Sequence, residues 1–201
     1  MHVLRLLRIF IPLLIVAAIV AGAVLVFTSR SELQRSHRAV ETSWTPLRHE
    51  LDTRFKSLKA ANLLVSTVPG PLHAVVADVG VAYTEWTVLE DSDSGVTTEV
   101  KSANKLEALG RRLVQAARKA PRLGGNAPAL AALAAFARLK GNKSALTAIE
   151  SLANLSPPEG SADFNAAVEH FEKERNRPAS QPAARILGYG SIPSYEATDP
   201  G

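Results

Sequence analysis

Apolar residues recur at helical spacing along most of the chain. Between residues 40 and 68, nine positions follow one another in steps of three or four, and eight of the nine are apolar. The members of this stripe are Val40, Trp44, Leu47, Leu51, Phe55, Leu58, Asn62, Val65 and Val68. Charged side chains occupy the positions between them, so the pattern predicts an amphipathic helix that buries one face.

Pro46 interrupts the polar face of this segment. A proline at this place either kinks a continuing helix or occupies the first turn of a new helix, with Thr45 as its cap. The apolar stripe keeps its register across Pro46, which is compatible with one bent helix. The sequence leaves both alternatives open.

Further helical stripes follow, and segments rich in Pro, Gly and polar residues separate them. The predicted helices cover residues 72–89, 106–120, 130–140, 146–155 and 164–171, with a polar turn over 90–98. No segment has the length and alternation of a strand. We therefore predict an all-α fold, an antiparallel bundle of sequential helices that abundant alanine allows to pack closely.

Residues 9–27 form a different pattern, because these 19 consecutive residues carry no charge. A helix of this length crosses about 30 Å of hydrocarbon, so the segment predicts a transmembrane helix in contact with the lipid bilayer. The alternative is a cleaved signal peptide, with Arg5 and Arg8 as its basic region and an exported helical protein as the product. The anchor is favoured because the apolar run is long and continues beyond Ala21-Gly22-Ala23, its small-residue cleavage candidate.

These patterns divide the chain into four parts. Residues 1–8 form a short flank, 9–27 the transmembrane helix, 28–176 the helical bundle, and 177–201 a Pro- and Gly-rich segment that packs back on the bundle or is extended. Basic residues stand on both sides of residues 9–27, so the positive-inside rule decides little about orientation.

Composition changes this picture in two respects. The chain has a formal net charge of +4, but without Arg5 and Arg8 it has 21 basic and 19 acidic residues. Such a mixed surface is not the basic footprint of a nucleic-acid-binding protein, so nucleic acid is excluded as a partner. The chain also contains 0 cysteines, which excludes disulfides, thiolate metal sites and a cysteine nucleophile.

The sequence contains no constellation that predicts catalysis or metal binding. His49-Glu50 begins the zinc motif HExxH, but Thr53 stands where the second His is required. Residues 91–95 resemble the start of a calcium loop, yet no alignment places a Glu at its last position. Residues 141–144 and 188–191 match neither a phosphate-binding loop nor a nucleophile elbow. We therefore expect no catalytic residue, no metal and no cofactor.

Three short stretches resemble the LemA family of bacterial membrane proteins. The first has the spacing V-x3-W-x2-L-x3-L-x2-R and consists of Val40, Trp44, Leu47, Leu51 and Arg54. The second has the spacing G-Y-x3-P-x-Y-E and consists of Gly188, Tyr189, Pro193, Tyr195 and Glu196. Between them, Pro121 with Leu123 and Asn126 is similar to the family's loop YPDLKAN. The chain departs from the family at its PNLV motif, because Lys59 replaces the proline.

The resemblance implies a non-enzymatic, single-pass protein of the bacterial cytoplasmic membrane, with its bundle on the cytoplasmic side. It implies a scaffold or partner-binding role, which leaves room for another envelope or membrane protein as partner and leaves the oligomeric state open. From the residues themselves we expect Trp44, Leu47 and Leu51 to face the core and Arg54 to pair with a carboxylate or a lipid phosphate. The closing segment either forms a clasp on the bundle, which we favour, or presents Tyr189 and Tyr195 to a partner.

Overall fold

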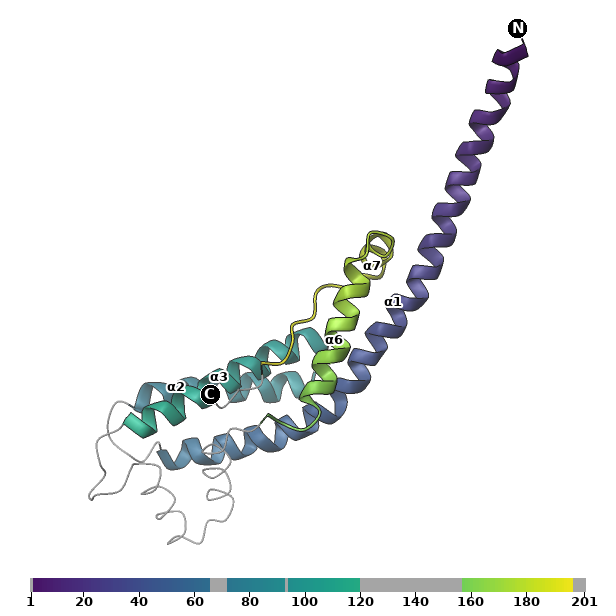
Figure 1. Ribbon diagram of the computed structural model, residues 1–201. Coiled ribbons are helices and arrows are strands. Elements are labelled where there is room, and N and C mark those ends of the chain that lie inside the picture. Colours follow the sequence, from purple (N-terminus) through teal and green to yellow (C-terminus); the bar gives the residue numbers. More distant parts are fainter. Residues whose placement is uncertain (1, 66–71, 93, 120–156, 197–201) are drawn as a thin grey trace. The chain divides into compact units, whose positions relative to one another are not determined.

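The computed structural model describes residues 2–65, 72–92, 94–119 and 157–196, with the backbone alone for residues 2–23, 25–26, 64–65, 72–73, 114 and 116–119. In these residues the regular structure is entirely helical (Figure 1). The helices are α1 (His2–Val65), α2 (Leu72–Glu90), α3 (Val96–Lys119), α6 (Ser161–Asn176) and α7 (Gln181–Leu187). The predicted all-α fold is therefore confirmed, while the helices predicted over 130–140 and 146–155 and the motif residue Pro121 lie outside the described residues.

Pro46 lies inside α1 and does not start a new helix. The alternative in which Thr45 caps a second helix is therefore wrong. Proline costs a helix one backbone hydrogen bond, and here the neighbouring apolar residues offset that loss. Trp44 and Leu47 are both buried on either side of an exposed Pro46, so the stripe packs without a change of register.

The chain divides into two compact units. The N-terminal unit comprises residues 1–41 and 166–192, and the central unit comprises residues 42–165 and 193–201. α1 and α6 each contribute residues to both units.

Apolar and aromatic side chains from α1, α2, α3 and α6 form the core of the central unit. Phe55 meets Trp86 edge to face, with ring centroids 5.1 Å apart, and Trp44 lies against Phe164 at 5.0 Å. The two tryptophans are 3% and 1% exposed, as expected from their positions on the apolar stripes. The other buried apolar side chains of this unit are Leu47, Leu51, Leu58, Ala61, Val79, Ala82, Tyr83, Val100, Ala103, Leu106, Leu109, Leu113 and Tyr195.

The turn between α2 and α3 is shorter than predicted. The sequence predicted a polar turn over 90–98, but α3 begins at Val96. Gly95 has a φ of 75°, a left-handed conformation that glycine adopts without steric cost. Its carbonyl accepts hydrogen bonds from the N–H groups of Thr98 and Glu99 at 3.1 and 3.3 Å. These bonds close the first turn of α3 inside the segment predicted as a turn.

Part of the Pro- and Gly-rich C-terminal segment is helical, which corrects the expectation of an extended chain. α7 has Pro182 in its first turn, where the missing N–H costs little. It ends at Gly188, whose φ is 69°. The N–H of Tyr189 donates to the Ala184 carbonyl at 2.9 Å and that of Gly188 to the Arg185 carbonyl at 3.3 Å. This pair of bonds is a Schellman motif, so the glycine ends the helix and the proline starts it.

Three aromatic rings organise the N-terminal unit. His37 of α1 stacks on Tyr189, with ring centroids 4.2 Å apart and planes within 5°, and Phe171 of α6 meets His37 edge to face at 5.4 Å. The buried apolar side chains around them are Leu33, Val40, Val168, Ala183, Ala184 and Ile192.

Among the described residues, no helix combines the length and apolarity needed to cross a bilayer. Most side chains of residues 9–27 lie outside that description.

Candidate functional site

Two asparagine side chains hold the backbone of the closing motif in the central unit. Asn165 of α6 donates to the carbonyl of Tyr195 at 2.9 Å and accepts from its N–H at 2.7 Å. Asn104 of α3 donates to the carbonyl of Ser194 at 2.9 Å and accepts from the N–H of Glu196 at 2.9 Å. We call Asn104 and Asn165 the asparagine clamp.

The asparagine clamp fits the geometry of an extended chain. In such a chain the N–H and C=O of one residue point to the same side, and those of its two neighbours point to the opposite side. Tyr195 therefore bonds to Asn165, and its neighbours Ser194 and Glu196 bond to Asn104. A carboxamide carries both a donor and an acceptor, which lets each side chain complete two bonds. The clasp expected for the closing segment is thus present in residues 194–196.

Tyr195 places its side chain in the core of the central unit and is 2% exposed. Burial raises the pKa of the Tyr195 phenol far above its ordinary value, and the negative charge of Glu107 raises it further. Ionisation would place a phenolate beside a buried carboxylate, which a low-dielectric interior strongly disfavours. Tyr195 therefore serves as a neutral anchor in the core and is not presented to a partner.

Arg54 pairs with the same carboxylate that faces Tyr195. Its Nε donates to Glu107 Oε1 at 2.6 Å and its Nη2 to Oε2 at 3.3 Å. The Glu107 side chain is 3% exposed and that of Arg54 18%. Of the two partners expected for Arg54, the structure shows the carboxylate on a neighbouring helix. Glu107 thereby joins the first motif to the closing one.

Trp44 makes a second buried polar contact with α3. Its Nε1 donates to Glu99 Oε2 at 2.5 Å, and Arg48 Nη2 lies 3.4 Å from the other oxygen of this carboxylate. Arg48 also donates to the carbonyl of Glu90 at the end of α2, at 2.8 Å. The motif tryptophan therefore packs in the core and also bonds α1 to α3.

Sequence reasoning did not single out Glu99, Glu107, Asn104 or Asn165. A signal for the two glutamates exists, because residues 99, 103 and 107 follow one another at a spacing of four through the buried Ala103. That spacing places both carboxylates on one ridge of α3. The asparagines stand at partly exposed helix positions, and no local pattern distinguishes them from ordinary surface residues.

The other motif residues lie in α1, at the end of α7 and in the segment that follows α7. Leu47 and Leu51 are fully buried, as expected. Tyr189 is partly buried and stacks on His37. Pro193 and Glu196 belong to the extended segment, and the Glu196 side chain is exposed. Gly188 ends α7.

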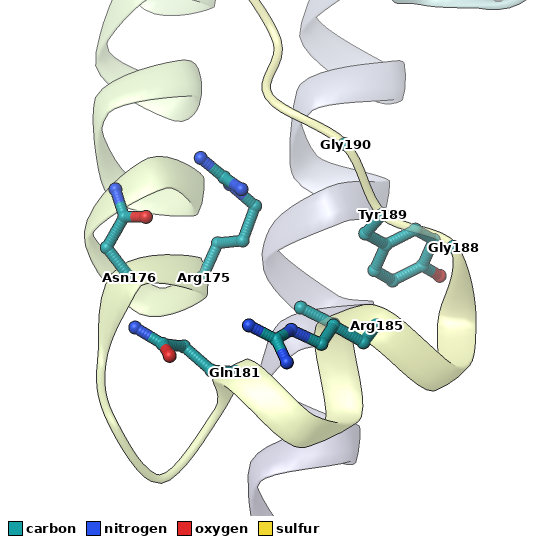
Figure 2. A pocket seen from close by; sticks show the side chains of 8 residues that line it. Arg175, Asn176, Gln181, Arg185, Gly188, Tyr189 and Gly190 are labelled. Atoms are coloured by element: carbon teal, nitrogen blue, oxygen red, sulfur yellow. The ribbon is translucent and has the colours of Figure 1, made fainter.

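A pocket of about 420 Å³ opens beside α6 and α7 in the N-terminal unit. Figure 2 shows the polar side chains of Arg175 and Asn176 from α6 and of Gln181 and Arg185 from α7 around one hollow. Gly188, Tyr189 and Gly190 line its other side, together with Ala184. None of these lining residues is acidic.

Glu172 supports this pocket without lining it. Its Oε2 accepts hydrogen bonds from Nε and Nη2 of Arg175 at 3.0 and 2.7 Å, and its Oε1 accepts one from the N–H of Ile192 at 2.9 Å. Burial by itself would raise the pKa of Glu172, but the hydrogen bonds from Arg175, Ile192 and Ser191 outweigh it and lower that pKa. The carboxylate thereby fixes one face of the Arg175 guanidinium.

Among the described side chains, no three His, Asp or Glu residues lie close enough together to hold a metal ion. Comparisons of the chain with protein-family models, curated protein sequences and solved structures find no match. The resemblance to the LemA family therefore depends on the sequence motifs alone.

Proposed function

We propose that this protein is a single-pass membrane protein of the LemA type, in which a helical bundle serves as a scaffold or partner-binding module. The observation that carries the proposal is the continuity of α1 from His2 to Val65. This one helix contains both the 19 uncharged residues 9–27 and the amphipathic stripe that begins at Val40. A helix satisfies its own backbone hydrogen bonds, which is what a segment in lipid requires.

The use of the buried polar side chains supports a non-enzymatic role. The carboxylates of Glu99 and Glu107 are occupied by Trp44 and Arg54, respectively. A catalytic carboxylate has to face substrate, whereas these two connect helices. Asn104 and Asn165 are likewise occupied by the chain's own backbone. We infer that these groups give the module a fixed shape.

We propose the bacterial cytoplasmic membrane as the location, with the bundle on the cytoplasmic side. Two cysteine variants test the anchor and its orientation in intact cells, because the chain contains 0 cysteines of its own. Val3→Cys marks the flank before residue 9, and Ala162→Cys marks an exposed position of α6. Gly160 is unsuitable because its φ of 81° disfavours a side chain.

We expect a membrane-impermeant maleimide to label Val3→Cys in intact cells and to label Ala162→Cys only after the cells are opened. Carbonate washing should leave the protein with the membranes. Labelling of both positions in intact cells, or recovery of the protein in the wash, contradicts the proposal. An intact mass that begins after residue 23 instead supports the second candidate, an exported helical protein with a cleaved signal peptide.

The scaffold role has its own test. Purified in non-ionic detergent after cross-linking in cells, the protein should carry a defined membrane or envelope protein in stoichiometric amount. The single variant Arg54→Met serves as the control, because it weakens the bundle and leaves residues 9–27 unchanged. Recovery of a bare monomer by light scattering from both samples counts against a scaffold.

A further inference from the structure

We propose that the pocket beside α6 and α7 binds a phosphate group. Arg175, Asn176, Gln181 and Arg185 supply its polar lining (Figure 2). The proposed scaffold role assigns no ligand to this pocket, and the packing of the core does not require its two arginines. A bound phosphate would account for them.

The lining favours an anion. Guanidinium groups present several N–H donors in a plane and match the oxygens of a phosphate in a bidentate manner. Two of the lining side chains carry such groups, and two more are carboxamides with N–H donors of their own. No lining residue is acidic. The carboxylate of Glu172 pairs with Arg175 from outside the lining, so the positive charge of Arg185 is the one that no described carboxylate pairs with.

One of the donors, Arg175, is held in place before binding. Glu172 bonds to Nε and Nη2 of Arg175 and leaves the Nη1 group of that residue outside the pair. Among the described residues, Arg185 has no ion pair and neither Asn176 nor Gln181 has a side-chain hydrogen bond. One guanidinium is therefore held in place and the other donors are available, a combination that lowers the entropic cost of binding.

The pocket has room for a phosphate and a small substituent. Its volume of about 420 Å³ lies within the usual range for ligand sites. Gly190 is one of the lining residues, and a Cβ added there would meet no atom within 4 Å. Unlike Gly188, it has no positive φ. A glycine at 190 is thus not required by the backbone, and its effect is to leave the wall of the pocket open.

The contact of the pocket with α1 indicates a source for the phosphate. Tyr189, which lines the pocket, stacks on His37 of α1 with ring centroids 4.2 Å apart. His37 stands ten residues beyond Phe27, or about 15 Å along a helix, and each headgroup layer of a bilayer is about 5–8 Å thick. If residues 9–27 span the membrane, the pocket lies next to the headgroup layer, so we take a lipid headgroup as the source; this choice rests on the proposed anchor, whereas phosphate binding does not.

The test uses the full chain in non-ionic detergent and two probes. Glycerol 3-phosphate, titrated by calorimetry, is a soluble phosphate monoester. Phosphatidylglycerol in mixed micelles, with phosphatidylcholine as the reference lipid, presents the same group as a headgroup and is followed by native mass spectrometry. We expect saturable binding of one phosphate compound per chain. Binding of the soluble probe supports the pocket even if the protein proves not to be anchored, so the two proposals can fail separately.

Three variants identify the pocket as the site. Arg185→Gln removes one lining charge and should weaken binding at least about tenfold. Lys173→Gln removes the same charge from an exposed position of α6 outside the lining and should change affinity less than about twofold. Gly190→Leu keeps every charge and adds bulk to the open wall, so it should also abolish binding while the helical circular dichroism is unchanged.

Three results overturn the proposal. The first is the absence of saturable binding to both probes at millimolar concentration. The second is an equal loss of affinity in Arg185→Gln and Lys173→Gln, which would indicate general surface charge. The third is full binding by Gly190→Leu, which would place the ligand elsewhere.

Discussion

Arg54 and Glu107 form a two-pronged ion pair between α1 and α3, with Nε of the arginine 2.6 Å from Oε1 of the glutamate. The glutamate is almost fully buried, and Tyr195 of the closing motif lies beside it. Arg54 and Tyr195, which are more than a hundred positions apart in the sequence, thus meet at the carboxylate of Glu107. Glu107 itself is part of neither motif. This junction, the asparagine clamp and the end of α7 each give a measurable expectation.

Removing the cation from this junction should destabilise the bundle. Arg54→Met leaves Glu107 buried without its partner, and such a loss costs about 3–5 kcal/mol. The double variant Arg54→Met, Glu107→Leu should recover most of that loss, because it removes the unpaired charge as well. Guanidinium unfolding of the full chain in detergent, followed by circular dichroism, measures both.

The exposed pair Lys105 and Glu85 is the matched control for this experiment. Their side chains are 51% and 49% exposed, at an N–O distance of 2.6 Å. Lys105→Met should cost less than about 1 kcal/mol. Equal costs for Lys105→Met and Arg54→Met would contradict the structural role given to the buried pair.

The asparagine clamp should protect individual amides of the closing segment. Asn165→Ala removes the acceptor for the Tyr195 N–H, and Asn104→Ala removes the acceptor for the Glu196 N–H. Asn165→Ala should cost about 1–3 kcal/mol, and Asn104→Ala, whose hydrogen bonds are exposed, about 0.5–1.5 kcal/mol. Each variant should increase hydrogen exchange at its own amide first. Asn176→Ala, at an exposed position of α6, is the control. Unchanged exchange at both amides in the two clamp variants would mean that other contacts hold the segment.

Tyr195 should make the fold sensitive to alkali. Its pKa is raised far above the ordinary value of 10.0 in the folded protein, whereas the unfolded chain ionises near that value. Above about pH 10 the unfolded state therefore binds fewer protons than the native state, and stability falls as the pH rises. Tyr195→Phe should lessen this decline and leave the stability at pH 7 nearly unchanged. Identical alkaline profiles for the two proteins would contradict a buried, neutral Tyr195.

Glu172 should make the stability of the folded protein fall in acid. The pKa of Glu172 is lowered below its ordinary value of 4.5 in the folded protein, so the stabilisation is present above about pH 4.5 and is lost as the pH falls through the folded pKa. Glu172→Gln should reduce stability at neutral pH and flatten the acid limb of the stability profile. The comparison of urea midpoints at pH 3 and pH 7 measures this, and a steeper acid limb in the variant would be inconsistent with it.

Gly188 and Gly190 should respond differently to the same substitution. Gly188→Ala forces a residue with a Cβ into a left-handed conformation at the end of α7, at a cost of about 1–2 kcal/mol. At residue 190 an added Cβ would meet no atom within 4 Å and the backbone has no positive φ. Gly190→Ala should therefore change the free energy of unfolding by less than about 0.5 kcal/mol. Thermal unfolding of both variants tests the Schellman motif, which predicts a loss for Gly188→Ala alone.

The sequence by itself determined the helical class and the residues of the stripe from Val40 that face the core, whereas only the structure showed that α1 continues through Pro46. Trp44, Leu47 and Leu51 are buried because the spacing of apolar residues along one helix is a local property, visible in a short window of chain. The apolar spacing did not predict α7, because the seven residues of this helix are too few to show an apolar stripe. It also placed the start of α3 too late, because the left-handed turn at Gly95 determines where that helix begins.

Only the tertiary structure decided which polar side chains meet. Glu99, Glu107, Asn104 and Asn165 read as ordinary polar positions of helices, and their partners Trp44, Arg54 and Tyr195 are distant in sequence. A hydrogen bond or an ion pair depends on distance and orientation between two elements, and a sequence pattern within one element contains neither. The apolar spacing therefore specifies the helices and their buried faces, whereas the packing of those faces decides where the arginine, the glutamates and the asparagines find their partners.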